Sequence, residues 1–67
     1  MKDWVKIFDT TYPWQASLIQ GMLEEEGIPC VLMNKQDTAY LFGQLELYVH
    51  PDEALRALTL IDKKQND

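Results

Sequence analysis

Cysteine is nearly absent from this sequence, which has one among its 67 residues. A single cysteine cannot form an intrachain disulfide, and this agrees with a reducing cytoplasm. Long apolar runs are also missing: none approaches the roughly 20 residues needed to cross a bilayer, and no apolar segment of a signal peptide follows Met1. We therefore expect a cytoplasmic protein with no membrane partner.

Positive charge is scarce as well. The chain has 6 Lys and Arg residues against 11 Asp and Glu residues, which gives a net charge of -5. The average electrostatic field of such a chain repels phosphate backbones. Nucleic acid is therefore not expected as a partner.

Groups able to perform catalysis are few. General acid–base or nucleophilic catalysis needs titratable side chains that converge, and the predicted strands contribute mainly apolar ones. Cys30 and His50 can approach each other if their strands pair, but no third ligand or orienting group accompanies them. We interpret them as a packed thiol and a surface imidazole. The sequence predicts no catalytic residue, no metal and no cofactor, and hence a protein that is not an enzyme.

The acidic run Glu24–Glu26 does not change this expectation. Consecutive helical residues point about 100° apart and cannot converge on one hard cation unaided. We interpret the run as a solvated helix end. Its place at the unfavourable end of the helix dipole slightly favours a basic partner.

The residues that are present describe a small folded domain. Apolar residues make up 46% of the chain and charged residues 25%, which is typical of a globular protein with a core. No linker or repeat divides the sequence, so we expect one domain over residues 1–67 with a frayed tail at 63–67. A chain this short buries only about 60% of its unfolded surface, so its margin of stability is small.

The first half of the chain predicts a strand followed by a helix. Residues 4–8 alternate in the manner of a strand. Its two predicted faces are Val5 with Ile7, and Trp4 with Lys6 and Phe8. Capping oxygens in residues 9–11 precede a helix that begins near Tyr12 and ends before Gly27, which can adopt the left-handed conformation. The predicted inner stripe of this helix is Ala16, Leu18, Ile19, Met22 and Leu23.

Two strands and a second helix follow. The apolar run Cys30–Met33 predicts a strand buried on both faces. Residues 45–50 alternate cleanly, so Leu45, Leu47 and Val49 are expected to face inward. Pro51 opens the last helix, whose acidic start and basic end complement its dipole. Its predicted inner stripe is Ala54, Ala57, Leu58 and Ile61.

These elements define an α+β fold of order β-α-β-β-α. A right-handed crossover makes the first two strands parallel, and the third strand fits between them, which gives a three-stranded antiparallel sheet of order 1-3-2. Both helices then cover one face, as in a ferredoxin-like fold truncated after its fifth element. An open edge at the first strand and an open face carrying Trp4, Phe8 and Tyr48 predict self-association, and thus a homo-oligomer.

Four segments together resemble a known family. They are Trp4–Phe8, Ala16 with Leu23 before Glu26–Pro29, Gly43 ahead of Leu45–Val49, and Ala54 in the last helix. The pattern resembles a small bacterial domain family of unknown function described as "putative prokaryotic signal-transducing protein". That family is similar in fold to PII-like, ferredoxin-like regulatory domains. The likeness spans nearly the whole chain, but it consists of core and turn residues and brings no catalytic residues.

The resemblance to PII-like proteins implies a role for the segment between the second and third strands. It would occupy the place of their longer partner-contacting loop. PII-like proteins commonly form trimers and bind nucleotides, but this chain has no glycine-rich phosphate cradle or basic cluster to hold one. From this resemblance we expect the position of the loop to be shared with PII-like proteins, but we do not expect nucleotide binding.

The candidate partner-binding residues lie mainly in that segment, residues 35–44. Tyr40, Leu41 and Phe42 place three large apolar side chains in a predicted loop, which either folds over the end of the core or recognises a partner. Trp14, in the first turn of the first helix, is interpreted as a staple against the sheet margin, with a contact surface as the alternative.

Two functions follow from these observations. The first is a non-enzymatic regulatory module that acts through protein–protein contacts and self-association. The alternative is a small-molecule sensor that holds a metabolite or nucleotide beneath the 35–44 loop. Its polar contacts would come from Asn34, Lys35, Gln36 and Asp37.

Overall fold

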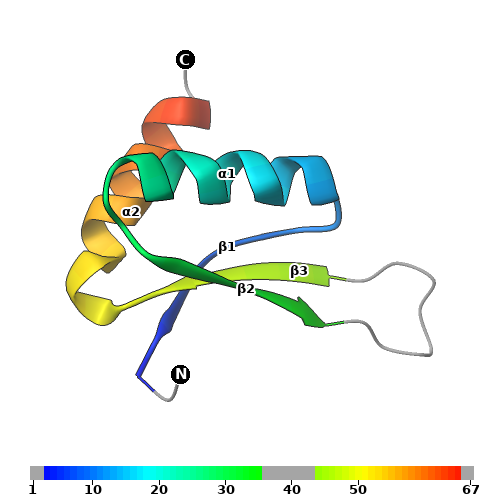
Figure 1. Ribbon diagram of the computed structural model, residues 1–67, viewed down its shortest axis with the longest axis horizontal. Coiled ribbons are helices and arrows are strands. Elements are labelled where there is room, and N and C mark those ends of the chain that lie inside the picture. Colours follow the sequence, from blue (N-terminus) through cyan, green and yellow to red (C-terminus); the bar gives the residue numbers. More distant parts are fainter. Residues whose placement is uncertain (1–2, 36–43, 66–67) are drawn as a thin grey trace.

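The computed structural model describes residues 3–35 and 44–65 and contains five regular elements (Figure 1). In chain order they are β1 (Val5–Thr10), α1 (Pro13–Glu25), β2 (Cys30–Lys35), β3 (Gln44–Val49) and α2 (Pro51–Gln65). The order of elements is the one that the sequence predicts.

The three strands form one sheet with β3 in the middle, in the order β1-β3-β2. Both outer strands run antiparallel to β3 and are therefore parallel to each other. Figure 1 shows α1 and α2 on the same side of this sheet. The predicted α+β fold is confirmed, and the arrangement is that of the first five elements of a ferredoxin-like fold.

The core lies between the sheet and the helices, and β3 supplies its centre. Leu45, Leu47 and Val49 alternate along β3 and are all buried, as the sequence predicts. Leu47 and Val49 are almost fully buried, and burial of such a side chain contributes roughly 1.5–3 kcal/mol. The main core cluster comprises Ile7, Ile19, Leu23, Ile28, Leu47, Val49, Ala57 and Ile61.

The start of α1 differs in detail from the prediction. The residue before the helix is Tyr12, and no side chain caps the helix there. The Thr10 hydroxyl instead accepts a hydrogen bond from the Tyr12 backbone N–H at 3.1 Å and donates one to Gln15 Oε1 at 2.6 Å. Pro13 occupies the first helical position, where its missing N–H costs nothing. Thr10 therefore shapes the turn into α1 without capping the helix.

The end of α1 is a Schellman motif. Gly27 has a φ of 78°, in the left-handed region that glycine adopts without strain. The Ile28 N–H donates to the Leu23 carbonyl at 2.9 Å, and the Gly27 N–H donates to the Glu24 carbonyl at 3.0 Å. Ile28 itself is fully buried and packs in the core. The predicted role of Gly27 is confirmed.

A bulge in β1 overturns one predicted face. Lys6 lies opposite Tyr48 and Phe8 lies opposite Leu47, so Ile7 is an extra residue on the β1 side. The extra residue reverses the alternation beyond it. Phe8 therefore packs against the core next to Ile7, and its predicted place on the open face with Trp4 is wrong.

The structure corrects the predicted burial of three other elements. β2 is an outer strand, and Leu32 and Met33 each keep 38% of their surface exposed, so it is not buried on both faces. Leu18 on α1 and Leu58 on α2 are exposed and do not belong to the inner stripes. Leu60 packs partly against the core from α2.

Two glycine substitutions in α1 and its cap are expected to change stability in opposite directions. Gly27→Ala places a side chain at positive φ and lowers the free energy of unfolding by roughly 1–2 kcal/mol. Gly21→Ala lies in the helix interior and raises it by roughly 0.5–1 kcal/mol. Apart from the adjoining residues and the backbone of α1 itself, no atom of the described residues lies within 4 Å of the added Cβ at either site, so both effects come from the backbone. Urea unfolding of both variants measures them, and an unchanged stability for Gly27→Ala contradicts the left-handed cap.

Candidate functional site

Cys30 and His50 come near each other in the sheet without forming a catalytic pair. Cys30 lies opposite Val49, the residue before His50. The Cys30 thiol nevertheless faces the Gln20 carbonyl at 3.9 Å. His50 Nδ1 accepts a hydrogen bond from the Asp52 backbone N–H at 3.2 Å. The thiol and the imidazole thus have separate, structural contacts.

The chemistry of the Cys30 thiol is that of a packed side chain. Burial raises the pKa of Cys30, and the negative charge of Glu24 raises it further. A reactive cysteine needs the opposite shift, because the thiolate is the nucleophile. Within residues 3–35 and 44–65, no group of three or more His, Cys, Asp or Glu side chains could hold a metal ion.

Large apolar side chains are exposed along the outer side of α1. Tyr12, Trp14 and Leu18 keep 58%, 66% and 47% of their surface exposed, and we call them the α1 outer stripe. The Tyr12 and Trp14 rings lie 6.1 Å apart between centroids, at an interplanar angle of 32°. Trp14 and Leu18 are four residues apart and share one face of the helix. The predicted staple role of Trp14 is wrong, and its alternative as part of a contact surface remains.

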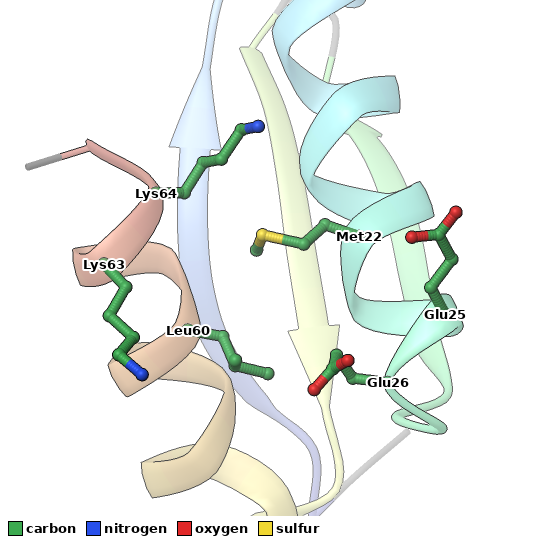
Figure 2. Close-up of a pocket in the computed structure, with 6 residues that line it drawn as sticks. All are labelled: Met22, Glu25, Glu26, Leu60, Lys63 and Lys64. Atoms are coloured by element: carbon green, nitrogen blue, oxygen red, sulfur yellow. The ribbon is translucent and has the colours of Figure 1, made fainter. Parts of the chain in front are cut away.

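A groove lies between α1 and α2, with a volume of ≈ 450 Å³. Figure 2 shows Met22 and Leu60 pointing toward each other from the two helices. The remaining lining residues are acidic on α1 and its end, and basic on α2: Glu25, Glu26, Lys63 and Lys64. We call this the interhelix groove; its floor is apolar and its two walls carry opposite charge.

The same arrangement explains the acidic run at the end of α1. The Arg56 guanidinium on α2 donates a hydrogen bond from Nη2 to the Glu26 carbonyl at 2.7 Å. A cation at the C-terminal end of a helix is favoured by the helix dipole. Arg56 therefore brings positive charge to the C-terminal end of α1 from within the chain, and Lys63 and Lys64 line the same groove as Glu25 and Glu26.

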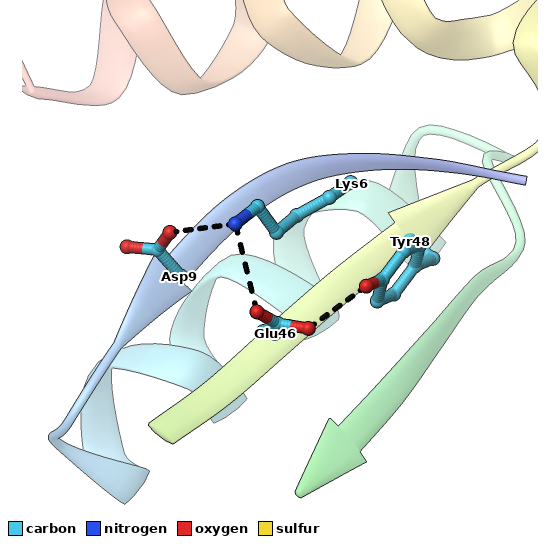
Figure 3. A network of polar contacts seen from close by, with 4 residues as sticks. All are labelled: Lys6, Asp9, Glu46 and Tyr48. Carbon is cyan, nitrogen blue, oxygen red and sulfur yellow. Dashed lines mark hydrogen bonds and ion pairs between the residues drawn. The ribbon is translucent and has the colours of Figure 1, made fainter. Parts of the chain in front are cut away.

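The sheet face opposite the helices carries a polar network (Figure 3). Lys6 Nζ lies 3.3 Å from Asp9 Oδ2 and 3.5 Å from Glu46 Oε2, and the Tyr48 hydroxyl donates to Glu46 Oε1 at 2.8 Å. The hydrogen bond with Asp9, followed by the charge of Glu46, raises the pKa of Lys6. The Glu46 side chain is only 7% exposed, whereas that of Lys6 is 44% exposed. The network ties β1 to β3 and makes the centre of the open face polar.

Three of the predicted partner-binding residues fall in the described parts of the chain. Trp14 lies in the α1 outer stripe, and Asn34 and Lys35 end β2, with Asn34 exposed. The other five lie outside the described residues: Gln36, Asp37, Tyr40, Leu41 and Phe42. The start of α1, which carries Trp14, and the end of β2 lie toward the same end of the sheet (Figure 1).

Sequence reasoning missed Tyr12 and Leu18 as surface residues, and it missed the interhelix groove. The signal for Leu18 was its spacing from Trp14, which puts both on the face opposite Ala16 and Ile19. The groove had no local signal, because its two walls are some forty residues apart in the chain.

Neither helix of the described chain is long and apolar enough to span a bilayer. This finding concerns residues 3–35 and 44–65.

Comparison with known proteins identifies the family. A family model described as "putative prokaryotic signal transducing protein" matches residues 4–65. No curated protein and no solved structure matches the chain. Since the family model covers nearly all of the sequence, the chain belongs to this family.

The raised pKa of Cys30 predicts slow alkylation. Its ordinary pKa is 9.0, and a higher pKa in the folded protein leaves less thiolate at a given pH. We expect iodoacetamide to react more slowly with native protein than with urea-unfolded protein at pH 8. The neutral thiol is the form that the fold favours, so its contribution to stability is complete below pH 9.0 and is lost as pH rises through the raised pKa.

Glu24→Gln is the matched variant for this experiment. It removes the second cause of the shift and leaves the burial, so the native alkylation rate should increase modestly. Native protein that alkylates faster than unfolded protein would contradict a raised pKa.

Proposed function

We propose that this member of the signal-transducing family is a non-enzymatic regulatory module of the cytoplasm. It acts by binding a protein partner and by associating with other copies of itself. The family description supports signal transduction in general. The binding mode is our inference from the surface.

The observation that carries this proposal is the α1 outer stripe. The core cluster is complete without these side chains, so folding does not explain them. Tyrosine and tryptophan are the residues that most often anchor protein interfaces, because they combine large apolar area with few rotatable bonds. An exposed Tyr12–Trp14 pair that continues into Leu18 therefore suits a protein partner.

The surroundings of the stripe also fit binding better than catalysis. Four titratable residues of the open face, Lys6, Asp9, Glu46 and Tyr48, contact one another in the polar network. Cys30 has a raised pKa, and His50 holds the start of α2. Each of these titratable groups is engaged in a contact within the fold. This arrangement supports a binding role more than a catalytic one.

Removal of the α1 outer stripe should abolish partner capture and leave the fold intact. Trp14→Ala combined with Leu18→Ala deletes two exposed side chains, so we expect the free energy of unfolding to change by less than about 0.5 kcal/mol per site. Affinity capture from the source organism, compared between wild type and variant, measures the loss of partner. Urea unfolding measures the stability.

This experiment has two control variants, one on the surface and one in the core. Leu55→Ala removes a more exposed leucine from α2 and should retain capture. Leu23→Ala opens a core cavity and should cost about 2–5 kcal/mol. Equal capture by the double variant and by wild type would rule out the stripe as the partner surface.

A second candidate function is small-molecule sensing, and the interhelix groove favours it. The apolar floor of Met22 and Leu60 lies between an acidic and a basic wall. Such a groove suits a small ligand that carries both a cationic and an anionic group around an apolar body. It is lined by residues of α1, its end and α2, and residues 36–43, beneath which the sequence predicted the ligand, lie outside the described residues.

A thermal-shift screen tests this candidate. A ligand that binds only the folded state raises the melting temperature in a dose-dependent manner. For a groove ligand, we expect the shift to disappear in a Lys63→Ala and Lys64→Ala variant and to persist in Leu55→Ala. A panel of amino acids, short peptides and nucleotides that produces no shift in wild type would count against the sensor.

A further inference from the structure

The two outer strands of the sheet differ in how well they can accept another strand. β1 is interrupted by its bulge, and it carries Lys6 and Asp9, which form an ion pair across that bulge. Bulges and charged side chains are two features that prevent edge strands from pairing with other chains. The β1 edge, which the sequence suggested for self-association, is therefore a poor template for another strand.

The β2 edge has neither feature. β2 pairs with β3 in unbroken register from Cys30 to Lys35, and residues 30–34 carry no charge. Among the described residues, no strand pairs with the other side of β2. Leu32 and Met33 are each 38% exposed there, on opposite faces of the sheet. A regular, uncharged and apolar outer strand is one that associates.

The order of residues along β2 suits antiparallel pairing with itself. When a two-fold axis perpendicular to the sheet relates two strands, each residue lies opposite a residue of the same sheet face. With the axis at Leu32, Leu32 lies opposite its own copy, Val31 opposite Met33, and Cys30 opposite Asn34. Apolar side chains then meet apolar ones at the centre of the pair. With the axis at Met33, Leu32 would lie opposite Asn34.

We propose that two copies of this chain join through β2 in the Leu32-centred register. The sheet then continues from one copy into the other, and all helices remain on one side. This inference rests on the self-association in the proposed function, and it adds the surface, the symmetry and the register.

A second copy paired with β2 would cover exposed β2 side chains on both faces of the sheet. Leu32 lies opposite Leu47 on the face that the helices cover, yet it stays exposed because β2 is the outermost strand. Leu32 of a second copy would cover it. On the open face, Val31 and Met33 of the two copies would cover each other. One symmetric contact thus buries both exposed apolar residues of the edge.

Cysteine cross-linking tests the contact directly. Leu32→Cys in a Cys30→Ser background places one thiol of each copy on the two-fold axis. Opposed side chains of an antiparallel pair have Cβ atoms about 4.5–5.5 Å apart, close to the range of a disulfide. We expect a disulfide-linked dimer to form on the order of ten times faster than in the control, because pairing raises the effective thiol concentration. The control is Leu58→Cys in the same background, at an exposed position on α2.

A mixed experiment tests the register. Val31→Cys and Met33→Cys, both in the Cys30→Ser background, lie opposite each other only if the axis is at Leu32. Their mixture should cross-link faster than either variant alone. A mixture that reacts no faster than the separate variants would overturn the register.

Light scattering separates this inference from self-association in general. We expect the wild-type mass to rise with concentration from 7.8 kDa toward twice that value. It should rise further on addition of salt, which screens the repulsion between two chains of net charge -5. Met33→Lys adds charge to the edge and should remain monomeric with an unchanged circular dichroism spectrum, whereas Leu55→Lys should behave as wild type.

The outcomes are distinct. A mass of 7.8 kDa at every concentration overturns both the β2 contact and self-association, and leaves the partner-capture result untouched. A dimer in which Leu32→Cys cross-links no faster than Leu58→Cys overturns the β2 contact alone.

Discussion

The central position of β3 is the constraint on which the rest of this structure depends. β3 pairs with both other strands, and its alternating Leu45, Leu47 and Val49 supply the surface on which both helices pack. A small domain has few such surfaces, so each buried side chain carries a large share of its stability. The placement of β3 in the middle also decides that β1 and β2 are both outer strands.

The bulge in β1 has consequences well beyond its own position. It turns Phe8 into the core, and it brings Lys6 and Asp9 to the same face, where residues three apart in a regular strand would lie on opposite faces. Glu46 joins this pair from β3, so the open face has a polar centre. The irregular, charged edge of β1 follows from this extra residue, whereas β2 has an unbroken register and no charge over residues 30–34. The contrast between the two edges is the basis on which association through β2 is proposed.

The exposed apolar side chains show what two helices and three strands leave uncovered. Helix α1 buries Ala16, Ile19 and Leu23 against the sheet, and its outer side still carries Trp14 and Leu18. The core cluster does not include these positions, which is why the proposed partner binding is assigned to this surface and not to the paired polar groups of the sheet. The proposed binding uses side chains at the start and on the outer side of α1, whereas the proposed association uses β2, so the two proposals call on different residues.

The sequence by itself determined the local features: the order of elements, the start of α1 near Tyr12, its end before Gly27, and the inward alternation of β3. These features depend on neighbouring residues, through backbone preference and periodicity. Three features were decided by the tertiary structure alone. They are the face of the sheet to which β1 residues after Ile7 point, the exposure of the β2 side chains, and the formation of a groove by residues of α1 and α2. Each of these features depends on which distant segment lies alongside. Neither a bulge nor the place of a strand at the edge of the sheet can be read from the residues of that strand alone. The physical reason is that burial and register are properties of pairs of segments, whereas propensity is a property of one.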